Sequence, residues 1–198
     1  MATTTSCMTT PPDHKKGLFD LPPELREEIY GLVVIKPRNT ITMLSNHGFF
    51  RSEVSASQPA LSRANHQLRN ETLATFYSSN VFLAEVSERD DLVTARRWLH
   101  AIGDLNVARL RHLALCGWTR VPFGHMMCRR WVRVILDLRE GSLKIEGNPA
   151  DQHEQITRAV DDLKESFQAL VAARDGRRFD AESLGEFMDG FHFSCVAY

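Results

Sequence analysis

The strongest constraint on the fold of this chain is a change of hydrophobic period between its middle and its last third. Val132, Val134, Leu136 and Leu138 stand at alternate positions, which is the two-residue period of a β-strand. Further on, apolar residues recur every three or four positions, as in an amphipathic helix: Ile156, Val160, Leu163, Phe167, Leu170 and Val171. Because no single class of secondary structure fits both patterns, we expect an α+β fold.

The remaining segments divide between the same two periods. Helices are expected over 23–36, 60–79, 90–106, 151–175 and from Asp180 onward. β-Hairpins are expected over 39–54 and 132–145, and single strands over 81–86 and 110–118. Residues 1–17 are predicted to form a disordered tail, and residues 18–198 a single domain of packed amphipathic helices with short β-hairpins that form a small sheet.

Composition excludes several classes of protein. The chain has 198 residues, of which 43% are hydrophobic, and its 24 lysines and arginines nearly balance its 25 acidic residues, so no overall field attracts nucleic acid or an anionic membrane. No apolar run approaches the roughly 18 residues of a membrane span. The four cysteines are widely spaced and no secretory signal precedes them, which predicts reduced thiols and a cytoplasmic or nuclear protein.

A search for catalytic and metal-binding motifs yields one candidate. Phosphate loops, nucleophile elbows and zinc-protease motifs are absent, so the chain is predicted to be no enzyme and to need no cofactor. The His-x-x-Cys spacing occurs twice, as His125 with Cys128 and as His192 with Cys195. Two such pairs can in principle complete a tetrahedral zinc site, although cysteines of this kind are more often small core residues.

Three short basic clusters offer a second kind of candidate site. They are ARRW from Ala95, CRRWVR from Cys128 and RDGRR from Arg174. Arginines beside Trp98 and Trp131 are the chemistry that holds single-stranded nucleic acid, but acidic residues are interleaved with them and the clusters are short. We therefore interpret the clusters as ordinary charged surface, with no nucleic-acid partner.

Two helical segments carry a family resemblance. LFDLPPELREEIYGLVV and PALSRANHQLRNETLATFYSSNVF together resemble fungal F-box-like proteins, a group related to the family named for two E-x-R motifs. The matching positions are Leu21, Pro22, Glu24, Leu25, Arg26, Ile29, Tyr30, Pro59, Leu61, Arg63, Gln67, Leu68, Arg69, Glu71, Phe76 and Tyr77. WLHAIGDLNVARLRHLAL is similar to a later segment of such proteins. About twenty residues separate the two helices, and Gln67-Leu68-Arg69 stands where the second E-x-R is expected.

The resemblance implies a non-enzymatic protein-interaction module, in the manner of a substrate receptor that docks on the Skp-type adaptor of a cullin ubiquitin ligase. Leu21, Pro22, Leu25 and Ile29 would then contact the adaptor. Two alternatives stay open: a fungus-specific regulatory or pathway protein without a ligase link, and a zinc protein that uses the His-x-x-Cys pairs. The stripe Leu25, Ile29, Leu32 and Val33 is interpreted first as a core face that packs on the second helix.

Overall fold

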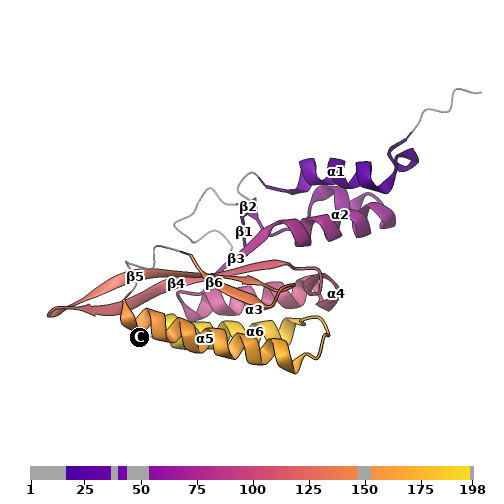
Figure 1. The fold of residues 1–198 in the computed structure, drawn as a ribbon. Helices are drawn as coiled ribbons and strands as arrows, with labels where there is room; N and C mark the ends of the chain where they lie inside the picture. Colours follow the sequence, from indigo (N-terminus) through magenta and orange to yellow (C-terminus); the bar gives the residue numbers. More distant parts are fainter. Residues whose placement is uncertain (1–16, 37–39, 44–53, 147–152, 197–198) are drawn as a thin grey trace, which may run out of the picture.

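A computed structural model describes residues 17–36, 40–43, 54–146 and 153–196, and Figure 1 shows its elements. Six α-helices are present in these ranges: α1 (Pro23–Val34), α2 (His66–Ser79), α3 (Arg89–Ile102), α4 (Asp104–Val107), α5 (Glu154–Ala173) and α6 (Ala181–Phe191). Short 3-10 turns, η1 (Leu18–Asp20) and η2 (Ala60–Arg63), precede α1 and α2, and a π-helical turn, η4 (His192–Val196), follows α6. The predicted α+β class is confirmed.

One mixed sheet contains all the strands of the described residues, in the order β2-β1-β3-β4-β5-β6. Its strands are β1 (Thr40–Thr42), β2 (Val54–Ser55), β3 (Val81–Glu85), β4 (His112–Phe123), β5 (Met126–Asp137) and β6 (Ser142–Ile145). In the part formed by β2, β1, β3 and β4, neighbouring strands are parallel. Strand β5 is antiparallel to both β4 and β6. The sheet therefore joins a parallel N-terminal half to a C-terminal meander.

The parallel half arises from a repeated order of helix and strand. Helix α1 leads to β1, α2 to β3, and the α3–α4 pair to β4. Strands that follow helices in this way enter the sheet from the same end, so they pair in parallel. The hairpin predicted over 39–54 is wrong, because β1 and β2 are parallel. The sequence SNHG, residues 45–48, at which that hairpin would turn, lies outside the described residues.

The core lies between the sheet and three helices, and Figure 1 shows α3, α5 and α6 together on one side of the strands. The predicted stripe of α5 faces inward, with Ile156, Val160, Leu163 and Phe167 buried. An aromatic cluster extends this core to α2, since Phe82 lies 5.4 Å from Phe76 and 5.3 Å from Trp98 between ring centroids. Helices α1 and α2 stand as a pair at the other end of the molecule (Figure 1).

Antiparallel strands are longer than expected. The strand predicted over 110–118 continues to Phe123, and β5 begins at Met126 after a two-residue turn in which Gly124 has a φ of +59°. A positive φ at the first turn position is easy only for glycine, which explains a tight hairpin where a loop was expected. The hairpin predicted over 132–145 is confirmed as β5 with β6.

Helix boundaries differ from the expectations at two starts. The second predicted helix is divided, because Asn65 adopts extended backbone and its side chain accepts a hydrogen bond from the Leu68 amide, so that α2 begins only at His66. Helix α5 begins at Glu154 with His153 as its cap. Asp151, where that helix was expected to begin, lies outside the described residues.

A buried asparagine fixes the ends of α1 and α2 together. The side chain of Asn80 has no exposed surface. Its Nδ2 donates to the backbone carbonyls of Val34 (3.1 Å) and Phe76 (2.8 Å), and its Oδ1 accepts from the Lys36 backbone amide (3.1 Å). One side chain thus satisfies backbone groups that two helix ends leave without intrahelical partners.

We predict that Asn80→Ala destabilises the protein by about 2–4 kcal/mol, because it leaves buried backbone groups unpaired. Denaturant unfolding followed by circular dichroism measures this change. Asn70→Ala, at an exposed position of α2, is the matched control and should leave the free energy of unfolding within about 0.5 kcal/mol of the parent value. Equal effects of the two substitutions would refute the role given to Asn80.

Candidate functional site

The contact between α1 and α2 is built on a carboxylate. Glu71 accepts two hydrogen bonds from Arg26, from Nε to Oε2 at 3.0 Å and from Nη2 to Oε1 at 2.9 Å. It also accepts one from the Tyr30 hydroxyl at 2.7 Å and one from the Gln67 side chain at 2.9 Å. Arg26 also donates to the Leu21 carbonyl at 2.7 Å. All five residues belong to the motifs that carry the family resemblance, so these motif positions hold the helix pair together.

These contacts shift the pKa of the Glu71 carboxylate and that of the Tyr30 hydroxyl. Hydrogen bonds, first from Arg26 and then from Gln67, hold the pKa of Glu71 at about 2, well below its ordinary value of 4.5. Burial, followed by the hydrogen bond to Glu71, raises the pKa of Tyr30. Glu71 therefore stays ionised down to strongly acidic pH, and the helix contact keeps its charge.

The apolar stripe of α1 lies on the solvent side of this contact. The exposed fractions are 45% for Leu25, 36% for Ile29, 87% for Leu32 and 54% for Val33, whereas the buried residues of α1 are Tyr30 and Val34. The interpretation of the stripe as a core face is therefore wrong. Arg26, Tyr30 and Val34 form the inward face, which lies about a third of a turn around the helix from the stripe.

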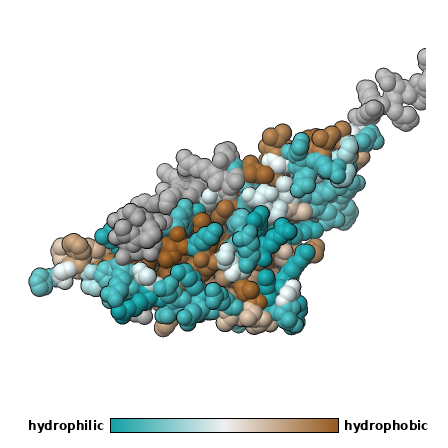
Figure 2. Space-filling model, in the orientation of Figure 1, coloured by the Kyte–Doolittle hydropathy of each residue, from teal (hydrophilic) through white to brown (hydrophobic). Residues whose placement is uncertain are grey.

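The exposed stripe forms one surface with the turn before α1. Phe19 in η1 is 44% exposed, and Figure 2 shows hydrophobic residues gathered over the outer side of the α1–α2 end. Of the predicted partner-binding residues, Pro22, Leu25 and Ile29 are exposed and Leu21 is half-buried. We call Phe19, Leu25, Ile29, Leu32 and Val33 the outer face of α1. Contiguous exposed apolar side chains of this kind mark interaction surfaces in stable proteins.

The His-x-x-Cys pairs are placed on different elements. His125 is exposed in the β4–β5 turn and Cys128 is half-buried in β5, whereas His192 and Cys195 lie in η4. The His192 Nδ1 is 2.7 Å from the Val86 carbonyl, and burial raises the pKa of the Cys195 thiol to about 12. Among the described residues, no group of three or more His, Cys, Asp or Glu side chains is arranged to hold a metal ion.

The three basic clusters are also separate in space. Arg96 forms ion pairs with Glu182 and Asp189 of α6, and Arg133 pairs with Glu146 at 2.7 Å. Trp98 packs against the core and donates to the Ala56 carbonyl at 3.1 Å. Arg96, Arg133 and Trp98 thus serve the fold, whereas the arginines of the third cluster, RDGRR, line a concave surface.

A second exposed apolar group escaped the sequence analysis. Phe123, Met126 and Met127, at the end of the β4–β5 hairpin, are each more than 60% exposed. The signal was present in the sequence as PFGHMM, but a loop was expected there and loop residues are ordinarily at the surface.

No helix of the described residues has the length and apolar character that crossing a membrane requires.

Comparisons with known proteins identify no relative. No family model matches this chain, and neither a curated protein nor a solved structure does so. The site is therefore assigned from its own residues.

We predict that acid unfolding depends on Glu71. Its pKa is lower in the folded state, so the stability from this carboxylate is complete above about pH 4.5 and disappears as the pH falls towards 2. Glu71→Gln should lower stability at neutral pH and flatten its pH dependence between these values, measured by urea unfolding at several pH values. Glu28→Gln, at an exposed position of α1, should keep the parental slope. A parental slope in Glu71→Gln would contradict the assignment.

We further predict that zinc is not a structural component. The purified protein should hold less than about a tenth of an equivalent of zinc, and dialysis against a chelator should leave the unfolding temperature unchanged. Inductively coupled plasma mass spectrometry measures the zinc content, and thermal unfolding measures the unfolding temperature. One equivalent of zinc that is lost in Cys128→Ser but kept in Cys116→Ser would instead establish a zinc protein.

Proposed function

We propose that this chain is a non-enzymatic protein-interaction module of the F-box-like kind that binds a protein partner through the outer face of α1, in the cytoplasm or nucleus. The observation that carries the proposal is the division of labour within α1. Arg26 and Tyr30 bind α2, while Leu25, Ile29 and Leu32 are left at the surface. A helix fixed by its polar side and exposed on its apolar side supports binding in a groove of another protein.

The spacing of the exposed residues supports the same mode of binding. Leu25, Ile29 and Leu32 stand at positions i, i+4 and i+7, the pattern by which an amphipathic helix fills a hydrophobic groove. Pro22 and the half-buried Leu21 continue this surface ahead of the helix. The family resemblance suggests the Skp-type adaptor of a cullin ubiquitin ligase as the partner, with the chain as its substrate receptor.

A second candidate is a regulatory or pathway-accessory protein with no link to a ubiquitin ligase. The observation that favours it is the connection between the two helices, because β1 and β2 lie between α1 and α2 in the chain and pair within the sheet. The helix pair is thus part of the whole domain and not a separate docking unit. Such a protein would use the outer face of α1 for another partner or for a second copy of itself.

We predict that Leu32→Arg and Leu25→Arg each leave the fold intact, with a change of stability within about 1 kcal/mol, because both positions are exposed. Each should weaken binding to a purified Skp-type adaptor by about tenfold or more, since a charge then replaces an apolar contact. Circular dichroism and isothermal titration calorimetry measure the two effects.

Val93→Arg is the matched control, because Val93 is 38% exposed on α3, away from the α1–α2 pair. It should bind the adaptor as the parent does. An established F-box protein serves as the positive control for the adaptor. If that protein binds and the parent chain does not, the ligase version is refuted and the second candidate stands. If Leu32→Arg unfolds the protein, the outer face of α1 is not a free surface.

A further inference from the structure

A basic cleft lies between one side of the α1–α2 pair and the body of the molecule. Its volume is about 680 Å³, within the range of about 300–1,000 Å³ usual for ligand-binding pockets. Residues of α1 and α2, among them Glu27 and Glu71, line one side. The other side is formed by three segments that are distant in the chain: 107–111 before β4, 138–139 after β5, and residues 174 and 176–179 between α5 and α6.

The charge of the lining is strongly biased. Six of the lining residues are arginines, and only two, Glu27 and Glu71, are acidic. Glu71 is already paired with Arg26. The arginines are Arg109, Arg111, Arg139, Arg174, Arg177 and Arg178. In a chain whose net charge is −1, such a concentration of positive charge on one concave surface favours an anionic ligand.

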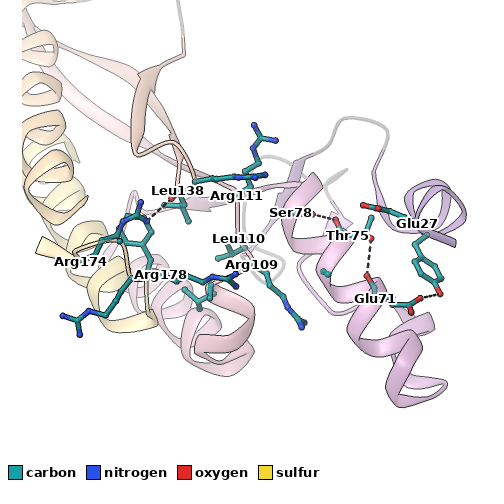
Figure 3. Close-up of a pocket in the computed structure, with 18 of the residues that line it drawn as sticks. Glu27, Glu71, Thr75, Ser78, Arg109, Leu110, Arg111, Leu138, Arg174 and Arg178 are labelled. Carbon is teal, nitrogen blue, oxygen red and sulfur yellow. Dashed lines mark hydrogen bonds between the residues drawn. The ribbon is translucent and has the colours of Figure 1, made fainter. Parts of the chain in front are cut away.

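Some of these guanidinium groups are held in place by the fold. Arg174 donates to the Leu138 carbonyl at 3.2 Å and stacks on Phe179, with its Cζ 4.5 Å from the ring centre. Arg109 donates to the Asn106 side chain at 3.2 Å. Figure 3 shows Arg109 reaching into the space between the two sides of the cleft. Side chains ordered before binding lose less conformational entropy when a ligand arrives.

The four other arginines of the cleft differ in whether they have a carboxylate partner. Arg111 is shared between Asp137 (3.4 Å) and Glu140 (3.7 Å). Within the part of the chain that the structure describes, Arg139, Arg177 and Arg178 form no ion pair, and all three are exposed. Positive charge that the fold leaves unpaired is available to a ligand.

The character of the cleft favours a peptide over nucleic acid. The two aromatic rings in its lining, Tyr30 and Phe179, are 1% and 6% exposed, so they offer no face on which a base can stack. In the other two basic clusters, Arg96 and Arg133 are engaged in ion pairs within the fold. Guanidinium groups bind carboxylate and phosphate in the same bidentate manner, and clusters of them recognise acidic and phosphorylated motifs.

We infer that the cleft binds an acidic or phosphorylated segment of a protein. The anion would lie against Arg177 and Arg178, with Arg109 and Arg174 as preordered neighbours. This deepens the proposed function, on which it rests for the protein nature of the ligand: α1 would bind one partner and the cleft another. The two sites use different residues, so each can fail without the other.

The test uses the full chain and a short fluorescein-labelled peptide with a phosphoserine between glutamates. Fluorescence anisotropy should show saturable, salt-sensitive binding, weakened about tenfold or more in Arg177→Glu/Arg178→Glu. The matched control is Arg129→Glu/Arg130→Glu, which makes the same change of charge at exposed positions of β5. It should bind as the parent does, and both double variants should keep parental adaptor binding.

Two further peptides identify the source of the anion. If a peptide with serine in place of phosphoserine binds equally well, the carboxylates are the ligand, and if it binds about tenfold more weakly, the phosphoryl group is. Either result supports the inference. A peptide with serine in place of phosphoserine and glutamine in place of every glutamate should not bind.

Four outcomes would overturn the inference. They are no binding of either acidic peptide, equal weakening by the two double variants, displacement of the peptide by inorganic phosphate at the peptide's own concentration, and tighter binding of a single-stranded oligonucleotide. The second would indicate unspecific attraction, the third a site for small anions and the fourth a nucleic-acid partner. Loss of adaptor binding in Leu32→Arg alone would leave the inference unaffected.

Discussion

The α1–α2 end of the molecule depends on one carboxylate. Glu71 gathers Arg26, Tyr30 and Gln67 around itself, and with Asn80 at the opposite end of the helix pair it fixes the rotation of α1 about its own axis. A helix has only one inward face, so assigning Arg26, Tyr30 and Val34 to it leaves Leu25, Ile29 and Leu32 outside. The polar contact thus decides where the apolar residues lie.

An ion pair in this position contributes more to specificity than to stability. Exposed or partly exposed pairs stabilise proteins weakly, because water competes for both charges. Here, however, the acceptor takes four hydrogen bonds and its donors come from two helices, so only one arrangement of the pair satisfies every group. The aromatic cluster of Phe76, Phe82 and Trp98 then joins this end to the main core.

The two candidate surfaces are arranged around the same helix pair. The outer face of α1 is apolar and convex, whereas the cleft beneath the pair is basic and concave. Glu71 takes part in both regions, since it holds α1 in place and lines the cleft. A molecule with two unlike surfaces on opposite sides of one rigid helix pair is suited to hold two different partners at once. This is the arrangement that the proposed function requires.

Local patterns were sufficient for most of the elements. The period of α5 and the alternation in β5 identified those segments, because each pattern depends on residues close in sequence. Pairing was harder to predict. The segment of β1 and β2 was expected to form a hairpin, but the two strands pair in parallel. Residues 119–131, the outer part of the β4–β5 hairpin, were expected to be a loop between strands. Which strand lies beside which depends on the path of the whole chain, and short apolar segments carry no signal of their partners.

For the candidate sites, the sequence by itself determined that α1 is amphipathic and that its motif residues belong to one unit with those of α2. It did not determine which side of α1 faces the protein, because Tyr30 and the apolar stripe are both suited to burial. Only the tertiary structure decided this, through the contacts of Tyr30 and Arg26 with Glu71, some forty residues away. The cleft is decided in the same way, since its arginines come from three distant segments that no sequence period connects.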